Sequence, residues 1–138
     1  MKLKGKLKKD GKFWLIEVPV LSAITQGRTK KEAFEMIEEY IINMSEEYFS
    51  KTLKLNITKL INNEFEIETN NTILLTALVL RSLRVSQDLT IKAISEKLGY
   101  SSVNGYAQYE QSKRELSCHK LSEMLSVLNP KVKLLIDL

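Results

Sequence analysis

The chain has 138 residues, of which 43% are hydrophobic and 28% charged, and its formal net charge at pH 7 is +4. This length and composition fit a globular protein of one domain or two small ones. No apolar run reaches the roughly 18 residues of a membrane span and no signal peptide is recognisable, so we expect a cytoplasmic protein. Cys118 and His119 are the only residues of their types, which predicts neither an internal disulfide nor a metal site, and we expect no cofactor.

The positive charge lies mainly in the second half of the chain. Residues 72–138 carry nine Lys or Arg against six Asp or Glu, whereas residues 1–71 carry twelve against eleven. A basic balance is the electrostatic footprint of a nucleic-acid-binding domain. The excess is small for a monomer, and a dimer would double it.

The first segment, residues 2–9, alternates lysine with leucine or glycine, which is typical of a half-buried strand. Asp10-Gly11 predicts a hairpin turn, and residues 12–18 a returning strand that ends at Pro19. A third strand is expected over residues 21–25. The lysine face could attract nucleic acid or an acidic partner, but such a face is more often solvated and keeps an edge strand from aggregating.

A helix is predicted to follow, with Thr29 as its N-cap and Glu32 completing a capping box. Gly27 is expected to allow the turn into this helix. Its apolar stripe is expected to pack in the core and consists of Ala33, Met36, Ile37, Tyr40, Ile41 and Met44. Residues 53–58 and 64–69 then alternate about a turn at Asn62-Asn63, so the order of elements is β-β-β-α-β-β.

Several motifs in this half follow one family pattern, namely an aromatic strand, a proline-containing turn, TQG-x-T, and EA at the start of the helix. The matching segments are Gly11-Lys12-Phe13-Trp14, Glu17–Leu21, Thr25–Thr29 and Glu32-Ala33. Over about residues 3–50 the chain therefore resembles the HicB antitoxin domain. It departs from the family at Val18–Ile24, which lacks the aspartate, glycine and cysteine of the usual PDLPGC-like segment.

The resemblance implies an α+β protein whose first domain, residues 1–69, is a β-β-β-α-β reduced ribonuclease H-like domain. It also implies a partner, a HicA-like toxin, which is a small mRNA-cleaving ribonuclease. We place the surface that binds this toxin at Trp14, Val20, Leu21, Thr25 and Gln26.

Residues 70–72, Asn-Asn-Thr, form a short polar break before a second domain, residues 72–138, which is predicted to be an all-α helix-turn-helix bundle. Thr72 is expected to cap its first helix, whose core side chains are Leu74, Leu75, Leu78, Val79 and Leu83. Ser117 is expected to cap its last helix, which ends at Asn129-Pro130 and whose core side chains are Leu121, Met124, Leu125 and Leu128.

Residues 89–115 lie between these two helices and predict two short helices at a sharp turn. Thr90 is the expected N-cap of the first, and Gly99 ends it because glycine adopts the left-handed conformation at no steric cost. Ser101 or Ser102 is expected to cap the second, which runs to about Gln111. On this second helix Tyr106, Tyr109 and Glu110 share one side, whereas Asn104, Gln108 and Gln111 share the other.

Amide side chains on an exposed helix face suit the edges of DNA bases, because they can donate to and accept from adenine at once. Basic side chains beyond the helix can hold phosphates. These features predict a helix-turn-helix motif, with residues 101–111 as the recognition helix. The candidate DNA-binding residues are Ser101, Ser102, Val103, Asn104, Gln108, Gln111, Lys113 and Arg114.

The same stretch resembles the Cro/repressor-like (XRE) domain, which pairs an LTxxxLAxxLG helix with a SxxxIxxxExGKR helix. Three positions depart from that pattern: Ile91 replaces a glutamine, Ser95 an alanine and Ser112 a glycine. The turn is also one residue longer, which leaves the recognition register open by one. The apolar tail Val132–Leu138 is expected to pack on its own bundle or on a second copy. Because operators are usually two-fold symmetric, we favour a homodimer through the C-terminal half, or a higher oligomer.

The leading hypothesis is an antitoxin that binds and occludes a HicA-like toxin and represses its own operon by binding operator DNA. The alternative is a free-standing XRE-type transcriptional regulator whose N-terminal domain senses a small ligand. An enzyme is not expected. A ribonuclease H-like nuclease needs several inward carboxylates to hold two metal ions, and the predicted strands offer Glu17 and, in a turn, Asp10.

Overall fold

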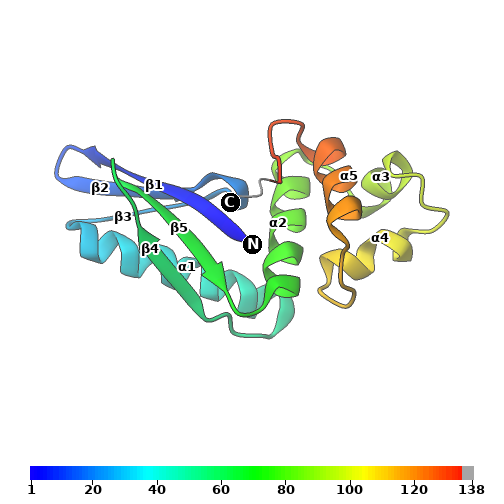
Figure 1. Cartoon of the computed structure of the whole chain (residues 1–138), viewed down its shortest axis with the longest axis horizontal. Helices are drawn as coiled ribbons and strands as arrows, with labels where there is room; N and C mark the ends of the chain where they lie inside the picture. The colour runs from blue at the N-terminus through cyan, green and yellow to red at the C-terminus, as the bar shows by residue number, and fades with distance from the viewer. Residues whose placement is uncertain (135–138) are drawn as a thin grey trace. The chain divides into compact units, whose positions relative to one another are not determined.

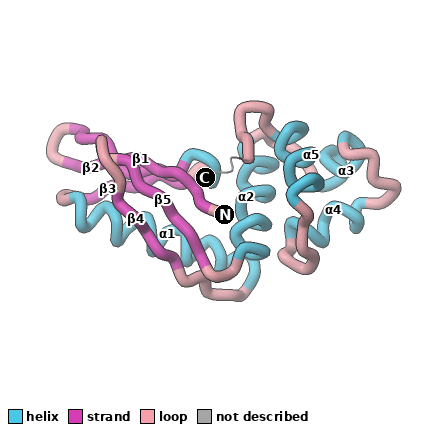
Figure 2. The backbone as a smooth tube through the Cα atoms, in the orientation of Figure 1, coloured by secondary structure: helices cyan, strands magenta, loops and turns pink. Residues whose placement is uncertain are grey.

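The computed structural model describes residues 1–134 of the chain (Figure 1). The chain divides into two compact units, Met1–Leu75 and Thr76–Leu138, of which the second is described as far as residue 134. The division falls inside helix α2 (Thr72–Ser86), and the loop residues 70–71 come just before this helix. The colours of Figure 2 show that the strands belong to the first unit and that the second is helical.

The N-terminal unit is an antiparallel sheet with one long helix. Within the described residues its elements are β1 (Lys2–Asp10), β2 (Phe13–Val18), the 3-10 turn η1 (Pro19–Leu21), β3 (Ala23–Gly27), α1 (Lys30–Phe49), β4 (Leu55–Lys59) and β5 (Glu64–Thr69). The strand order is β3-β2-β1-β5-β4, and each neighbouring pair is antiparallel. The predicted order β-β-β-α-β-β is confirmed and includes one strand more than the β-β-β-α-β domain implied by the resemblance. That this unit has a reduced ribonuclease H-like fold remains a prediction.

The third strand starts later than predicted. Pro19 ends β2, as expected, but it also begins η1, which takes up Leu21 before the sheet resumes at Ala23. Proline suits the first position of such a turn because its fixed φ is compatible with helical geometry and it has no N–H to leave unsatisfied.

Helix α1 packs on one face of the sheet. The core between them is formed by buried side chains of β1, β2, β5 and α1, namely Leu3, Leu7, Ile16, Val18, Phe65, Ile67, Ala33, Ile37 and Ile41. Thr29 caps the helix as predicted, since its Oγ1 accepts a hydrogen bond of 3.1 Å from the Glu32 amide. The Glu32 carboxylate accepts from the Arg28 amide at 2.9 Å rather than from that of Thr29, so the capping box is displaced by one residue.

The predicted apolar stripe of α1 is wrong at Met36 and Tyr40, which are 39% and 42% exposed. The buried positions instead form a single row at intervals of four residues, from Ala33 through Ile37 and Ile41 to Ser45. A helix lying on one flat sheet face buries a narrow strip, and residues 100° away from that strip remain in contact with solvent.

Gly27 lies at the junction of β3 and α1, where it permits close packing. A Cβ atom at this position would lie 2.4 Å from the backbone nitrogen of Ala33, so only glycine lets β3 approach the first turn of α1. Gly5 on β1 is similar, because an added Cβ would lie 2.1 Å from the ring of the buried Phe65.

The lysine face of β1 lies in the middle of the sheet and not at an edge, which corrects the predicted role of these lysines. Lys2, Lys4 and Lys6 stand opposite Glu68, Glu66 and Glu64 of β5. Ion pairs of 3.1 Å join Lys2 to Glu66 and Lys6 to Glu17. Because the positive row is compensated by neighbouring carboxylates, this face has little net attraction for a polyanion.

The C-terminal unit is built from the greater part of α2 together with α3 (Ile91–Lys97), α4 (Val103–Glu110) and α5 (Cys118–Leu128). Asn71, and not Thr72 as predicted, caps α2, since its Oδ1 accepts from the Leu74 amide at 3.0 Å. Ser117 caps α5 as predicted, with 3.2 Å between its Oγ and the Lys120 amide. Of the side chains predicted for its core, those within this unit are buried, namely Leu78, Val79, Leu83, Leu121, Met124, Leu125 and Leu128. Leu74 and Leu75 are also buried but belong to the N-terminal unit.

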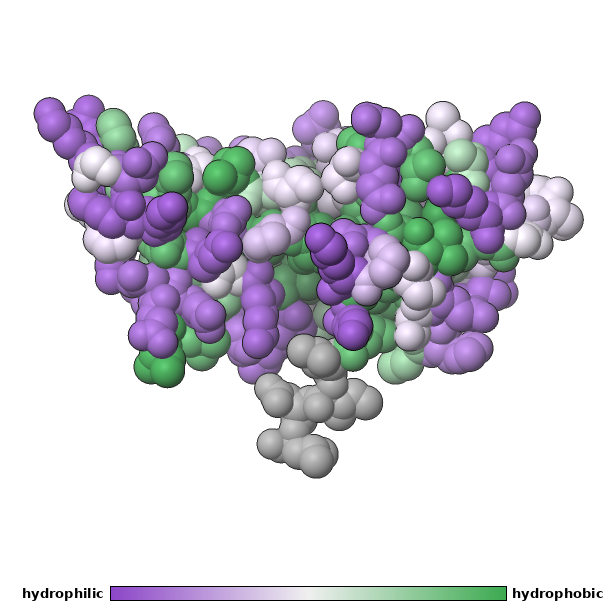
Figure 3. Space-filling view, turned by 90° about the horizontal axis from the view of Figure 1, so that it is seen from above, coloured by the Kyte–Doolittle hydropathy of each residue, from purple (hydrophilic) through white to green (hydrophobic). Residues whose placement is uncertain are grey.

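Figure 3 shows one face of the molecule, on which hydrophilic side chains lie between scattered hydrophobic ones. None of the helices in residues 1–134 has the length and apolarity required to cross a lipid bilayer. The predicted packing of the tail concerns residues 135–138 in large part, and these lie outside the described residues.

Candidate DNA-binding site

The first helix of the predicted motif, α3, has both its start and its end where the sequence places them. Thr90 Oγ1 accepts a 3.0 Å hydrogen bond from the Ala93 amide. Gly99 follows the helix with φ +77°, the left-handed conformation. The Tyr100 amide donates to the Ser95 carbonyl at 3.0 Å and the Gly99 amide to the Glu96 carbonyl at 3.1 Å, which is a Schellman motif. This sharp stop directs the chain into α4.

The second helix, α4, has one buried and one exposed side, as predicted. Tyr106, Tyr109 and Glu110 are buried. Asn104 and Gln111 are exposed and Gln108 is half-buried. The amide side chains therefore lie on the side of α4 that faces away from the core.

The first residues of α4 are also accessible. Ser101, Ser102, Val103 and Asn104 are all exposed. Ser102 takes the N-cap position, but its side chain accepts no cap hydrogen bond from the described residues. The start of α4 therefore has no side-chain cap from Ser102 and presents exposed small side chains. The N-terminal end of a recognition helix is the part that contacts base edges in the major groove.

The end of α4 repeats the motif that ends α3, with serine in place of glycine. Ser112 has φ +57°, and its amide donates to the Tyr109 carbonyl at 3.3 Å, while the Lys113 amide donates to the Gln108 carbonyl at 2.9 Å. These are the two bonds of a Schellman motif. The exposed Lys113 and Arg114 follow at once, and the Arg114 guanidinium lies 5.3 Å from the centroid of the Tyr109 ring. Lys113 is therefore held at the end of α4 by its backbone amide, and Arg114 by its contact with the Tyr109 ring.

A buried ion pair holds α4 to α2. Arg84 Nε lies 3.0 and 2.9 Å from the two carboxylate oxygens of Glu110, and Arg84 Nη2 lies 2.6 Å from one of them. Arg84 Nη1 donates at 2.7 Å to the Leu89 carbonyl, just before α3. The side chains are 11% and 2% exposed. Hydrogen bonding to Glu110 raises the pKa of the Arg84 guanidinium, although burial acts in the opposite direction.

This ion pair was not predicted from the sequence. Glu110 was expected on the same side of α4 as Tyr106 and Tyr109, and a carboxylate on an apolar side requires a cation or several donors. That requirement was the signal, but residues 72–138 carry nine Lys or Arg, and the sequence does not show which of them meets it. Burial also raises the pKa of the Tyr106 phenol, and the negative charge of Glu110 raises it further.

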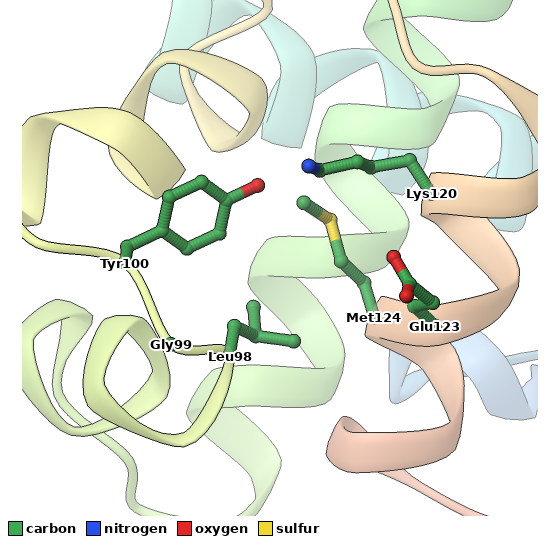
Figure 4. A pocket seen from close by; sticks show the side chains of 6 residues that line it. All are labelled: Leu98, Gly99, Tyr100, Lys120, Glu123 and Met124. Carbon is green, nitrogen blue, oxygen red and sulfur yellow. The ribbon is translucent and has the colours of Figure 1, made fainter.

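The Tyr100 ring packs against α4 at Gly105. A Cβ atom at Gly105 would lie 2.7 Å from the Tyr100 ring, so the absence of a side chain there leaves room for this ring against α4. Figure 4 shows Tyr100 and Lys120 of α5 pointing toward one another across a small pocket, which Met124 also lines. Lys120 Nζ lies 5.3 Å from the centroid of the ring. Neither Tyr100 nor Gly105 was singled out from the sequence.

The residues predicted to bind a toxin do not form one cluster. Leu21 is only 2% exposed, so its side chain belongs to the core and offers no surface. Trp14 and Thr25 are half-buried on the face of the sheet that α1 covers, whereas Gln26 is exposed on the opposite face. Trp14 lies between two lysines, with Nζ of Lys9 and of Lys30 at 5.0 and 4.7 Å from its ring. Val20 is half-buried in η1.

Two short helices joined by a sharp turn, with the second exposing amides and ending in two cations, define a helix-turn-helix DNA-binding domain. The comparison with known families agrees, since the model of the helix-turn-helix family HTH_3 matches residues 80–132. These residues are an XRE-type domain and indicate a DNA-binding transcriptional regulator. None of the curated proteins compared with the chain matches it.

Proposed function

We propose that this chain is a transcriptional regulator that reads operator DNA with α4. The observation that carries this conclusion is the exposed start of α4, where Val103 and Asn104 stand beside helix amides without a side-chain cap from the described residues. Asn104 would pair with an adenine edge and Val103 would contact a thymine methyl group. Lys113 and Arg114 would hold phosphates and set the register without reading bases.

Selection of binding sites from a random pool of duplex DNA tests this assignment. We expect the full chain to enrich a motif with a fixed A·T pair opposite Asn104, and two half-sites about one helical turn apart if the chain acts as a homodimer. The variant Asn104→Ala should lose the preference at that pair and keep the rest of the motif. Recovery of no motif by the wild-type chain would contradict sequence-specific binding.

We further infer that the regulator is an antitoxin that represses its own operon. The support is the resemblance of residues 3–50 to the HicB domain, above all the segment Thr25–Thr29 followed by Glu32-Ala33. In this proposal the N-terminal unit binds a HicA-like ribonuclease and blocks its active site by occlusion, so the antitoxin itself needs no catalytic group. The C-terminal unit, as a homodimer, represses the promoter.

Co-expression with the product of the adjacent short gene tests the antitoxin proposal. We expect that product alone to arrest growth, and the full chain to restore growth and to co-purify with it. A control chain with Lys113→Ala and Arg114→Ala should restore growth equally well, because these residues belong to DNA binding. A harmless neighbour that does not bind the chain would end the antitoxin proposal and leave the DNA-binding function untouched.

A further inference from the structure

Helix α1 carries a second row of apolar side chains, parallel to the row that packs on the sheet. Met36 and Tyr40 are exposed and Met44, one turn further, is half-buried. These three residues, the α1 ridge, have the same spacing of four as Ala33, Ile37 and Ile41 and are displaced from them by about 100° around the helix. The row continues to Tyr48, which is exposed and whose ring meets that of Phe49 edge-on at 6.3 Å.

An acidic row runs along the other side of the α1 ridge. Glu35, Glu39 and Glu47 are exposed, each one position before a member of the apolar row. None of these three forms an ion pair with another residue of the described range, in contrast to Glu17 and Glu66 of the sheet, which do. Lys31 stands one turn before Glu35 in the same row, so the row as a whole keeps a net negative charge.

The opposite flank of α1 differs, because it is occupied by contacts within the unit. The Phe34 ring meets that of Phe65 edge-on at 5.2 Å, and Lys59 Nζ lies 4.8 Å from the Phe34 ring centroid. Both flanks of the helix carry large apolar residues. The flank of Phe34 contacts the sheet, whereas the flank of Met36 and Tyr40 is exposed to solvent. The exposure of Met36 and Tyr40 is thus a property of one flank and not of the helix as a whole.

We propose that the α1 ridge and its acidic row are the docking surface for a basic protein partner, and this rests on the proposed antitoxin function. Methionine and tyrosine are enriched at protein interfaces, where they fill pockets and can adapt to a partner. An apolar side chain of the partner seats between Met36 and Tyr40, and its lysines or arginines face Glu35 and Glu39. The same carboxylates repel nucleic acid, so the ridge is separate in charge and in position along the chain from the DNA-reading helix α4.

The α1 ridge lies apart from the residues that the sequence indicated as the partner surface. Leu21 is in the core, and Trp14 and Thr25 are half-buried beneath α1. Met36 and Tyr40 were expected inside because the sequence pattern did not separate the sheet-facing row from its neighbour. Their exposure makes them apolar side chains of α1 that a partner can reach.

The test is a binding titration of the full chain with the product of the adjacent short gene. Replacement of Met36 and Tyr40 by alanine should weaken binding by about 10- to 100-fold, which is typical for the loss of central interface anchors. The double substitution Glu35→Lys and Glu39→Lys should slow association and abolish its dependence on salt. Matched controls are Asn56→Ala with Thr58→Ala on β4, and the charge-equivalent pair Glu115→Lys with Glu123→Lys in the C-terminal unit.

A second measurement locates the contact directly. A photo-crosslinking amino acid at position 40 should capture the partner, whereas the same amino acid at position 58 should not. If the wild-type chain binds and both ridge variants bind equally well, the docking surface is wrong and the antitoxin function stands. If the wild-type chain does not bind the partner, both are wrong. If the alanine variant instead disrupts association of the chain with itself, the ridge is a contact between two copies and the proposal is overturned.

Discussion

Replacement of Glu110 by alanine should destabilise the C-terminal unit strongly, because it leaves the Arg84 guanidinium buried without its anion. The carboxylate makes three contacts of 2.6–3.0 Å with Arg84, and only 11% of the arginine side chain is exposed. Breaking a buried pair in this way costs about 3–5 kcal/mol. Arg84 keeps its bond to the Leu89 carbonyl, so we expect the lower end, about 3 kcal/mol, or roughly a 150-fold change in the folding equilibrium.

Urea unfolding of the full chain can assign this loss to one unit. Trp14 is the only tryptophan, so its fluorescence follows the N-terminal unit, while helical circular dichroism reports on both. In Glu110→Ala the unfolding midpoint of the C-terminal unit, seen by circular dichroism without a change in fluorescence, should move to a lower urea concentration. The midpoint of the N-terminal unit, seen by Trp14 fluorescence, should not change. A unit of this size has a total stability of only a few kcal/mol, about 0.05–0.15 kcal/mol per residue, so the shift will be large.

The double variant Arg84→Met with Glu110→Met tests whether the two side chains contribute to stability as an ion pair or independently. Well-packed apolar replacements of a buried pair are often neutral or stabilising, so the double variant should lie within about 1 kcal/mol of the wild type. If its loss equals the sum of the two single losses, the pair does not act as a unit and the reasoning is refuted.

Three further changes test other parts of the structure. Ser112→Gly should stabilise the C-terminal unit by about 0.5–1 kcal/mol in urea unfolding, because Ser112 is held in a left-handed conformation, and Gly99→Ser should have the opposite effect. Because the pKa of Tyr106 is raised in the folded state, above about pH 10 the folded phenol keeps a proton that the unfolded phenol loses. The contribution of Tyr106 to stability should therefore be complete below about pH 10 and fall by up to about 1.4 kcal/mol per pH unit above it. The variant Tyr106→Phe should remove this slope. Gly27→Ala should cost the N-terminal unit about 1–3 kcal/mol or more in the Trp14 transition, since its Cβ meets the backbone of Ala33, and an unchanged midpoint would refute this packing.

Local signals in the sequence predicted the helix-turn-helix unit well. Thr90 and Ser117 are caps and Gly99 is left-handed, as expected, because each depends on hydrogen bonds or sterics within a few residues. The split of α4 into a buried side and an exposed amide side followed from helical periodicity alone.

Features that depend on distant residues could not be predicted in the same way. The position of β1 at the centre of the sheet comes from its pairing with β5, about 60 residues later in the chain. The pairing of Arg84 with Glu110 and the contact between Gly27 and Ala33 likewise depend on how whole elements approach one another. The exposure of Met36 and Tyr40 follows from the narrow contact of a helix on a flat sheet, which periodicity did not resolve.

The most direct test of the central claim is a fluorescence anisotropy titration of the full chain with DNA from the promoter of its own gene. The account predicts binding to this DNA at least about 1,000-fold tighter than to a shuffled duplex at the same salt concentration. Asn104→Ala should lose about 1–3 kcal/mol on the promoter and almost nothing on the shuffled duplex, while Thr58→Ala in the N-terminal unit should match the wild type. Equal affinity for both duplexes, together with no effect of Asn104→Ala, would contradict the claim that α4 reads operator DNA.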